Sequence, residues 1–248
     1  MNLLYLVLYQ SCNQKCKHCP MEKWIYEPDE CFEDGRRKNM FSGHGKIDML
    51  QDWISKYIDP NEWLIEITGG EPGMLPDISP FIFGLQRRNY KGLIKTNGTL
   101  PIPKTNNFKR IAAWHKCNIE MPKYYDLILI LKNPNDNWQD KEKYCIKNDI
   151  PHVCFNYNTY IPEDKEGVII KRNIYGIIKN MSTVFASGDM TGCFSGAPVE
   201  GKSVFKMSEP EICQVKKQCP WCPNIEGFEY FITNPFVSDF IKYISVYN

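Results

Sequence analysis

The stretch LLYLVLYQSCNQKCKHCP, residues 3–20, decides the fold of this chain of 248 residues. Its first seven residues are apolar and rich in β-formers, so they predict a short strand. Cys12, Cys16 and Cys19 follow in a polar loop, with gaps of three and two residues. Three thiols can hold one metal cluster and leave a fourth coordination position open for substrate chemistry. The alternative is a zinc knuckle completed by His18, but that residue is adjacent to Cys19 and is poorly placed to reach the same tetrahedral ion.

Short apolar runs alternate with helical spacing as far as about residue 160. The predicted strands are residues 3–9, 63–68, 92–96, 110–114, 126–131 and 152–156, and the predicted helices are residues 47–58, 78–88 and 138–148. Strands that alternate with helices indicate parallel pairing with right-handed crossovers. A complete eight-unit barrel takes about 250 residues, so we expect an α/β fold with a partial parallel β/α barrel of about six units.

The pattern changes after residue 160, where a turn-rich segment with little apolar material carries a second set of cysteines: Cys193, Cys213, Cys219 and Cys222. Such a segment cannot bury enough surface to fold unaided. Four thiolates can close a zinc site or an iron-sulfur cluster, and the bound metal would supply the missing stability. We therefore expect a barrel over residues 1–160, a small cysteine-rich extension over 161–233 and a docking helix over 234–248.

Composition narrows the function classes. The chain has 11 cysteines, an odd number that cannot pair completely in disulfides. The sequence has neither an export signal nor an apolar run long enough for a membrane span, so we expect a cytoplasmic protein with reduced thiols and no membrane partner. A net charge of +1 excludes general nucleic-acid binding driven by a global field.

Two later motifs join the C-x3-C-x2-C loop in a pattern that resembles the radical S-adenosylmethionine (SAM) superfamily. Thr68-Gly69-Gly70-Glu71-Pro72 follows the second predicted strand and is similar to the GGEP motif of that family. Thr96-Asn97-Gly98-Thr99 follows the third predicted strand and is similar to its TNG stretch. Ligands of parallel sheets bind at the carboxyl ends of the strands, so we expect all three motifs to converge on one rim.

The resemblance implies a 4Fe-4S cluster on Cys12, Cys16 and Cys19, with SAM bound at the open iron. It further implies that the methionine end of SAM is held by Gly69, Gly70, Glu71 and Pro72, its ribose by Thr96 and Asn97, and its adenine by His18. An electron from a donor such as flavodoxin or ferredoxin then cleaves SAM to methionine and a 5′-deoxyadenosyl radical, which abstracts a hydrogen atom from the substrate.

The later cysteines resemble the SPASM or twitch extensions that follow many barrels of this family. This likeness implies a second iron-sulfur cluster, of the 4Fe-4S type, on Cys193, Cys213, Cys219 and Cys222, and structural zinc is the alternative. A closed cluster would accept or relay an electron, which favours net oxidation. Two further residues are candidate catalytic groups: His115, which follows the fourth predicted strand onto the rim, and Cys31 in a polar insertion.

We therefore expect a radical SAM oxidoreductase that acts on a small polar metabolite, such as a sugar, an aminocyclitol or a nucleoside. The alternative is a maturase that crosslinks or oxidises side chains of a peptide substrate. A metal-stabilised interaction module without enzymatic activity is the least favoured hypothesis, because it leaves the convergence of the motifs unexplained.

Overall fold

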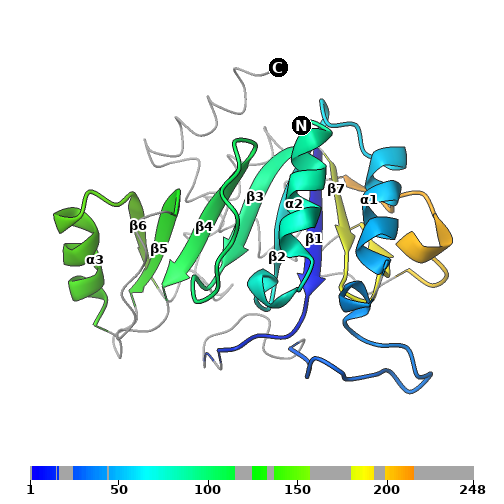
Figure 1. The fold of residues 1–248 in the computed structure, drawn as a ribbon, viewed down its shortest axis with the longest axis horizontal. Helices are drawn as coiled ribbons and strands as arrows, with labels where there is room; N and C mark the ends of the chain where they lie inside the picture. Colours follow the sequence, from blue (N-terminus) through cyan, green and yellow to red (C-terminus); the bar gives the residue numbers. More distant parts are fainter. Residues whose placement is uncertain are drawn as a thin grey trace.

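The computed structural model describes residues 2–14, 16, 25–43, 45–114, 125–132, 137–156, 180–192 and 199–214. These residues form one nine-stranded sheet with its helices on one face (Figure 1). The strands are β1 (Asn2–Tyr9), β2 (Trp63–Gly69), β3 (Lys91–Thr96), β4 (Phe108–Trp114), β5 (Leu127–Lys132), β6 (His152–Asn156), β7 (Asn180–Val184), β8 (Met190–Thr191) and β9 (Cys213–Gln214). The helices are α1 (Lys46–Tyr57), α2 (Ile78–Arg87) and α3 (Trp138–Lys147), and short 3-10 turns occupy Met40–Ser42, Pro72–Met74 and Val204–Lys206.

The sheet has the order β6-β5-β4-β3-β2-β1-β7-β8, and β9 also pairs with β7. All neighbours from β6 to β7 are parallel, whereas β8 and β9 run antiparallel to β7. The predicted strands and their parallel pairing are therefore confirmed, and the largest difference is that β4 begins at Phe108 instead of residue 110. This mostly parallel α/β sheet is consistent with the predicted partial barrel.

Two connections differ from a simple repeat of strand and helix. Residues 97–107, all of them described, join β3 to β4 without a helix. Strand β7 lies in the range that the sequence assigns to the extension, yet it pairs with β1 and belongs to the main sheet. The predicted domain boundaries and the docking helix stay predictions, because residues 157–179 and 215–248 lie outside the described part of the chain.

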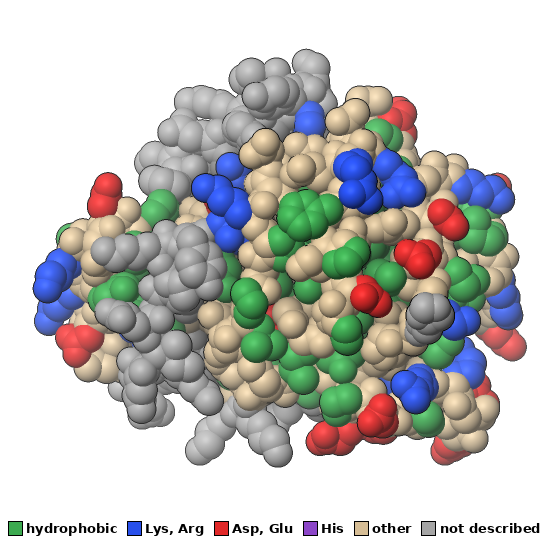
Figure 2. Space-filling model, viewed as in Figure 1, with side chains coloured by type: hydrophobic (Ala, Val, Ile, Leu, Met, Phe, Trp, Pro, Cys, Tyr) green, Lys and Arg blue, Asp and Glu red, His purple; other side chains and the backbone are tan. Residues whose placement is uncertain are grey.

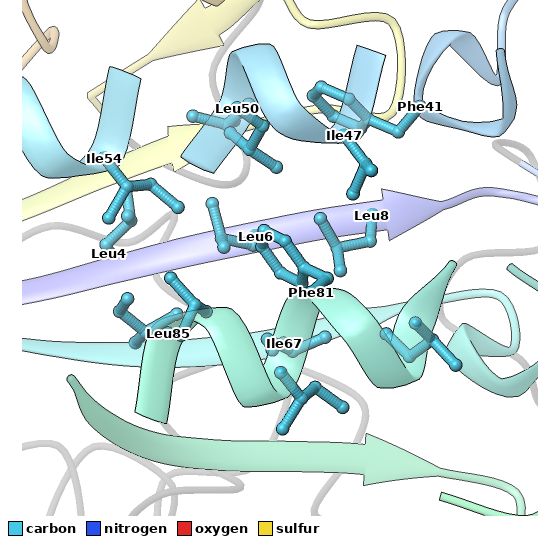
Figure 3. Packing of buried hydrophobic residues seen from close by; sticks show 14 of the residues in the cluster. Leu4, Leu6, Leu8, Phe41, Ile47, Leu50, Ile54, Ile67, Phe81 and Leu85 are labelled. Carbon is cyan, nitrogen blue, oxygen red and sulfur yellow. The ribbon is translucent and has the colours of Figure 1, made fainter. Parts of the chain in front are cut away.

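The main core lies between the sheet and helices α1 and α2 (Figure 3). Alternate residues of β1 point toward these helices, and α1 and α2 supply apolar residues at helical spacing. The core side chains labelled in the figure are Leu4, Leu6, Leu8, Phe41, Ile47, Leu50, Ile54, Ile67, Phe81 and Leu85. Full burial of each such side chain contributes about 1.5–3 kcal/mol, so this layer fixes the strands that carry the predicted motifs.

The helix-covered face is amphipathic. Figure 2 shows apolar side chains near its centre, with charged side chains of both signs around them. Within the described residues, every helix is too short or too polar to cross a membrane.

Candidate functional site

The carboxyl end of β2 lies directly against the start of the cysteine loop. Gly69 has a φ of +135°, and a Cβ atom there would lie 2.3 Å from the carbonyl oxygen of Tyr9. A Cβ atom on Gly70 would lie 2.2 Å from the carbonyl oxygen of Ser11. The amide of Gly70 donates to Tyr9 O at 2.6 Å, and the amide of Glu71 donates to Ser11 O at 2.9 Å. Glycine at both positions permits this approach of two backbones, which joins two of the predicted motifs.

Glu71 ties the loop after β2 to the loop after β3. Its buried carboxylate accepts hydrogen bonds from Gly73 N at 2.8 Å, from Asn97 N at 2.7 Å and from Thr96 Oγ1 at 2.7 and 2.9 Å to its two oxygens. Burial raises the pKa of Glu71 above its ordinary value of 4.5, and the hydrogen bonds from Asn97, Thr96 and Gly73 oppose that rise. Each of the two carboxylate oxygens thus accepts from two donors, and Glu71 joins both loops.

Asn97 joins the loop after β3 to the cysteine loop. Its Nδ2 donates to Asn13 Oδ1 at 2.8 Å and lies 3.6 Å from Cys12 Sγ. The amide of Gln14 also donates to Cys12 Sγ, at 3.4 Å. Hydrogen bonds to sulfur are among the contacts that tune iron-sulfur clusters, so Cys12 and its surroundings fit the role of a cluster ligand.

The other predicted residues of the first site are described only in part. Cys16 is half-buried, and its thiol donates to Gln14 Oε1 at 3.5 Å. Cys19, His18 and His115 lie outside the described residues. Within the described ranges, no three His, Cys, Asp or Glu side chains come together as a metal site requires. The predicted triad thus has two described members, both in the loop that follows β1.

Three cysteines lie away from both predicted clusters. Cys31 is exposed in the polar insertion, where its backbone forms a β-bridge with Arg37, and its catalytic role stays a prediction. Cys145 of α3 and Cys154 of β6 belong to the smaller core between that helix and the sheet. Burial raises the pKa of Cys145 to about 11 and the pKa of Cys154 to about 12, with Glu142 adding to both shifts. These two thiols therefore stay protonated at neutral pH, as expected of packing residues.

Cys213 is the described member of the second cysteine set. It begins β9 and pairs with Met181 of β7. A Cβ atom on Gly192 would lie 2.7 Å from Cys213 N and 3.0 Å from Cys213 Cβ. Cys213 therefore packs against the residue that directly precedes Cys193 in the chain. The remaining predicted ligands of this set, Cys193, Cys219 and Cys222, lie outside the described residues.

The sequence analysis does not single out Glu66 and Lys95, two charged residues on the sheet. Glu66 lies between Ile65 and Ile67, which belong to the core under the helices, so its side chain is on the opposite face. Glu66 Oε1 lies 2.6 Å from Lys95 Nζ, and the Glu66 side chain is buried. A glutamate within an apolar strand is the sequence signal that could have identified this pair.

Comparison with known proteins gives a match at the level of structure. No protein-family model and no curated protein matches the sequence. The structure of SuiB from Streptococcus suis bound to S-adenosylmethionine matches with a TM-score of 0.54 and 12% identity, over 95% of this chain and 71% of SuiB. The structure of SuiB alone matches with a TM-score of 0.53 and 12% identity, over 82% of this chain and 63% of SuiB. The structure of SuiB bound to the precursor peptide SuiA matches with a TM-score of 0.50 and 14% identity, over 84% of this chain and 64% of SuiB.

At such low sequence identities, these matches show a shared fold and nothing more. In two of the three matches this chain spans less than two thirds of SuiB. The likeness to SuiB is therefore one of fold, and the chemistry of the site has to be argued from the residues described above.

Proposed function

We propose that this chain is a radical SAM enzyme that cleaves SAM reductively and removes a hydrogen atom from its substrate. The observation that carries the proposal is the set of contacts at the carboxyl ends of β1, β2 and β3. Glu71 bonds to Thr96 and Asn97, and Asn97 in turn reaches Cys12. The fold match to SuiB bound to S-adenosylmethionine supports the same ligand.

In this proposal the three loops hold one ligand between them. An iron-sulfur cluster, when bound, supplies the electron for SAM cleavage, and its ligands are Cys12, Cys16 and Cys19. The Glu71 carboxylate would bind the ammonium group of SAM, together with Gly69, Gly70 and Pro72, while Thr96 and Asn97 would hold the ribose and His18 the adenine. The hydrogen bonds among the three loops hold these residues close together at one end of the sheet.

We assign a second iron-sulfur cluster to the extension, on Cys193, Cys213, Cys219 and Cys222. The packing of Gly192 against Cys213 supports this assignment, because it brings Cys213 next to the segment that leads into Cys193. Met181, the partner of Cys213, pairs with Leu3, which precedes Tyr9 by six residues, or about 20 Å along β1. Cys213 thus lies near the opposite end of β1 from the first cysteine loop.

The substrate class has two candidates. We propose a small polar metabolite that undergoes net oxidation, with a flavodoxin or ferredoxin as electron donor and His115 and Cys31 as candidate catalytic residues. The match to SuiB bound to the precursor peptide SuiA favours peptide modification as the second candidate.

The test is the formation of 5′-deoxyadenosine from SAM by protein that has been reconstituted anaerobically with iron and sulfide. We expect the wild type to form this product, and to bind about eight irons when both sites carry 4Fe-4S clusters. Cys16→Ala should abolish the product, whereas Cys154→Ala, a matched change beside α3, should retain it. Equal product from Cys16→Ala and the wild type would contradict the cluster assignment, and a colourless protein that binds only zinc would contradict the enzymatic function.

A further inference from the structure

The face of the sheet opposite α1 and α2, which we call the inner face, carries three polar residues that the proposed function leaves unused. They are Glu66 on β2, Lys95 on β3 and Thr183 on β7, and we call them the inner polar cluster. Each lies next to a residue that packs under the helices, so strand alternation directs it to the inner face. Thr183 and Glu66 flank Tyr5 of β1 in one row of the sheet.

Two oxygen atoms of the inner polar cluster lack a hydrogen-bond partner within the described part of the chain. Glu66 Oε1 lies 2.6 Å from Lys95 Nζ in an ion pair and has no further described partner. Thr183 Oγ1 is buried and has no described partner. Native proteins pair nearly all of their buried polar atoms, so the Thr183 hydroxyl, and a Glu66 oxygen that is held by an ion pair alone, call for a bound group that completes them.

The charges of the cluster select the kind of group. A carboxylate or phosphate would meet the negative Glu66, and an ammonium group would meet the positive Lys95. A hydroxyl group accepts from Lys95 and donates to Glu66 at the same time. The Lys95 side chain is 22% exposed while that of Glu66 is 2% exposed, so the pair is approached from the lysine side.

We infer that the inner polar cluster binds an uncharged hydroxyl group of the substrate. Thr183 lies two strands from Glu66, about 10 Å between their Cα atoms, on the far side of Tyr5, whose side chain shares the inner face. The inference deepens the proposed function and rests on it for its link to the reaction, because Lys95 directly precedes Thr96 of the proposed SAM loop. The same chemistry occurs in polyhydroxylated metabolites and in the serine and threonine side chains of peptides.

The experiment measures binding by titration calorimetry with the full chain and three pairs of probes. They are myo-inositol and cyclohexanol, uridine and 2′,3′-dideoxyuridine, and an N-acetylated serine amide and its alanine counterpart. We expect at least one hydroxylated probe to bind about tenfold more tightly than its partner. Lys95→Met and Glu66→Gln should each remove this preference. The control is Lys91→Met, which changes a lysine at the other end of β3 and should preserve the preference.

The outcomes are distinct. Preference for inositol or uridine identifies a metabolite as the source of the hydroxyl, and preference for the serine amide identifies a peptide. Equal binding within all three pairs up to the solubility limit would overturn the inference, as would a preference that both variants retain. Binding needs neither iron nor SAM, so the absence of 5′-deoxyadenosine formation alongside an intact preference would contradict the proposed function alone.

A second measurement separates a ligand site from a structural ion pair. The double variant Glu66→Gln with Lys95→Met removes both charges together and leaves no unpaired charge in the sheet. We expect its melting temperature to equal or exceed that of the wild type, because replacement of a buried ion pair is often neutral or stabilising. A clear fall in melting temperature would assign the pair to stability and overturn the inference.

Discussion

β2 and the loop that follows it contain two buried glutamates, Glu66 and Glu71, in contrasting surroundings. Glu71 lies just beyond the strand and accepts hydrogen bonds from three residues of two loops. Glu66 lies within the strand, and Lys95 is its ion-pair partner. A buried charge is costly unless it is hydrogen-bonded or paired, and the two glutamates meet this requirement in different ways. Glu71 is held by hydrogen bonds that join two loops, whereas Glu66 is balanced by the charge of one lysine.

A substitution at the loop end of β2 should lower the stability of the protein more than a substitution within the strand. Gly69→Ala should lower the free energy of unfolding by about 4 kcal/mol, because the new Cβ would collide with Tyr9 O and the backbone would keep a strained positive φ. Urea denaturation followed by circular dichroism measures this loss. Gly201→Ala is the control, since Gly201 has a φ of +76° but open space around it, and should cost about 1 kcal/mol. Equal losses would contradict the role of the close approach.

Glu71→Gln should have the next largest effect and should lower the free energy of unfolding by about 2 kcal/mol at neutral pH. The amide can accept from only one side, so either Gly73 N or Asn97 N would lose its partner. The folded-state pKa of Glu71 is raised, so the folded chain takes up a proton more readily than the unfolded chain between 4.5 and that higher value. The stability contributed by this group therefore falls as the pH rises through that window.

Urea denaturation over a series of pH values tests this linkage. The wild type should lose stability relative to Glu71→Gln as the pH rises above 4.5, the ordinary pKa of the group. An identical pH dependence in the two proteins would show that Glu71 does not titrate in this way.

The smallest effects should distinguish two buried threonines. Thr96→Val should lower the free energy of unfolding by about 1.5 kcal/mol, because it removes the hydroxyl that donates to the Glu71 carboxylate. Thr183→Val should leave it unchanged or raise it by about 0.5 kcal/mol, because the hydroxyl that it removes has no described partner. Thermal and urea unfolding of the two variants measure the difference. Similar losses in both would remove the contrast between the two sides of β2.

The sequence predicts the six parallel strands and three helices well, because each is a short run with a clear period between turn residues. It does not predict the position of β7. Its sequence, NMSTV, indicates a short strand at most, and its partner β1 is distant in the chain. Local pattern carries no information about such a partner.

The candidate site, too, is predicted from the sequence in some respects and not in others. The order of motifs and strand ends predicts that Cys12, Glu71 and Asn97 lie near one another, and in the structure Asn97 contacts both of the others. The sequence does not predict that Glu71 is buried under the loop after β3. That outcome depends on backbone amides whose direction is set by the fold and leaves no trace in residue type.

β1 can pair with β7 only after the ribosome has made both strands. Asn180 Nδ2 donates to Asn2 Oδ1 at 3.0 Å, across 178 positions of sequence. At about 5–20 residues per second, a ribosome needs on the order of ten seconds or more to make the second strand after the first. Until then one edge of LLYLVLY is uncovered, and an open apolar edge is prone to aggregate. The yield of folded protein in a cell therefore depends on chaperone capacity and on the rate of translation.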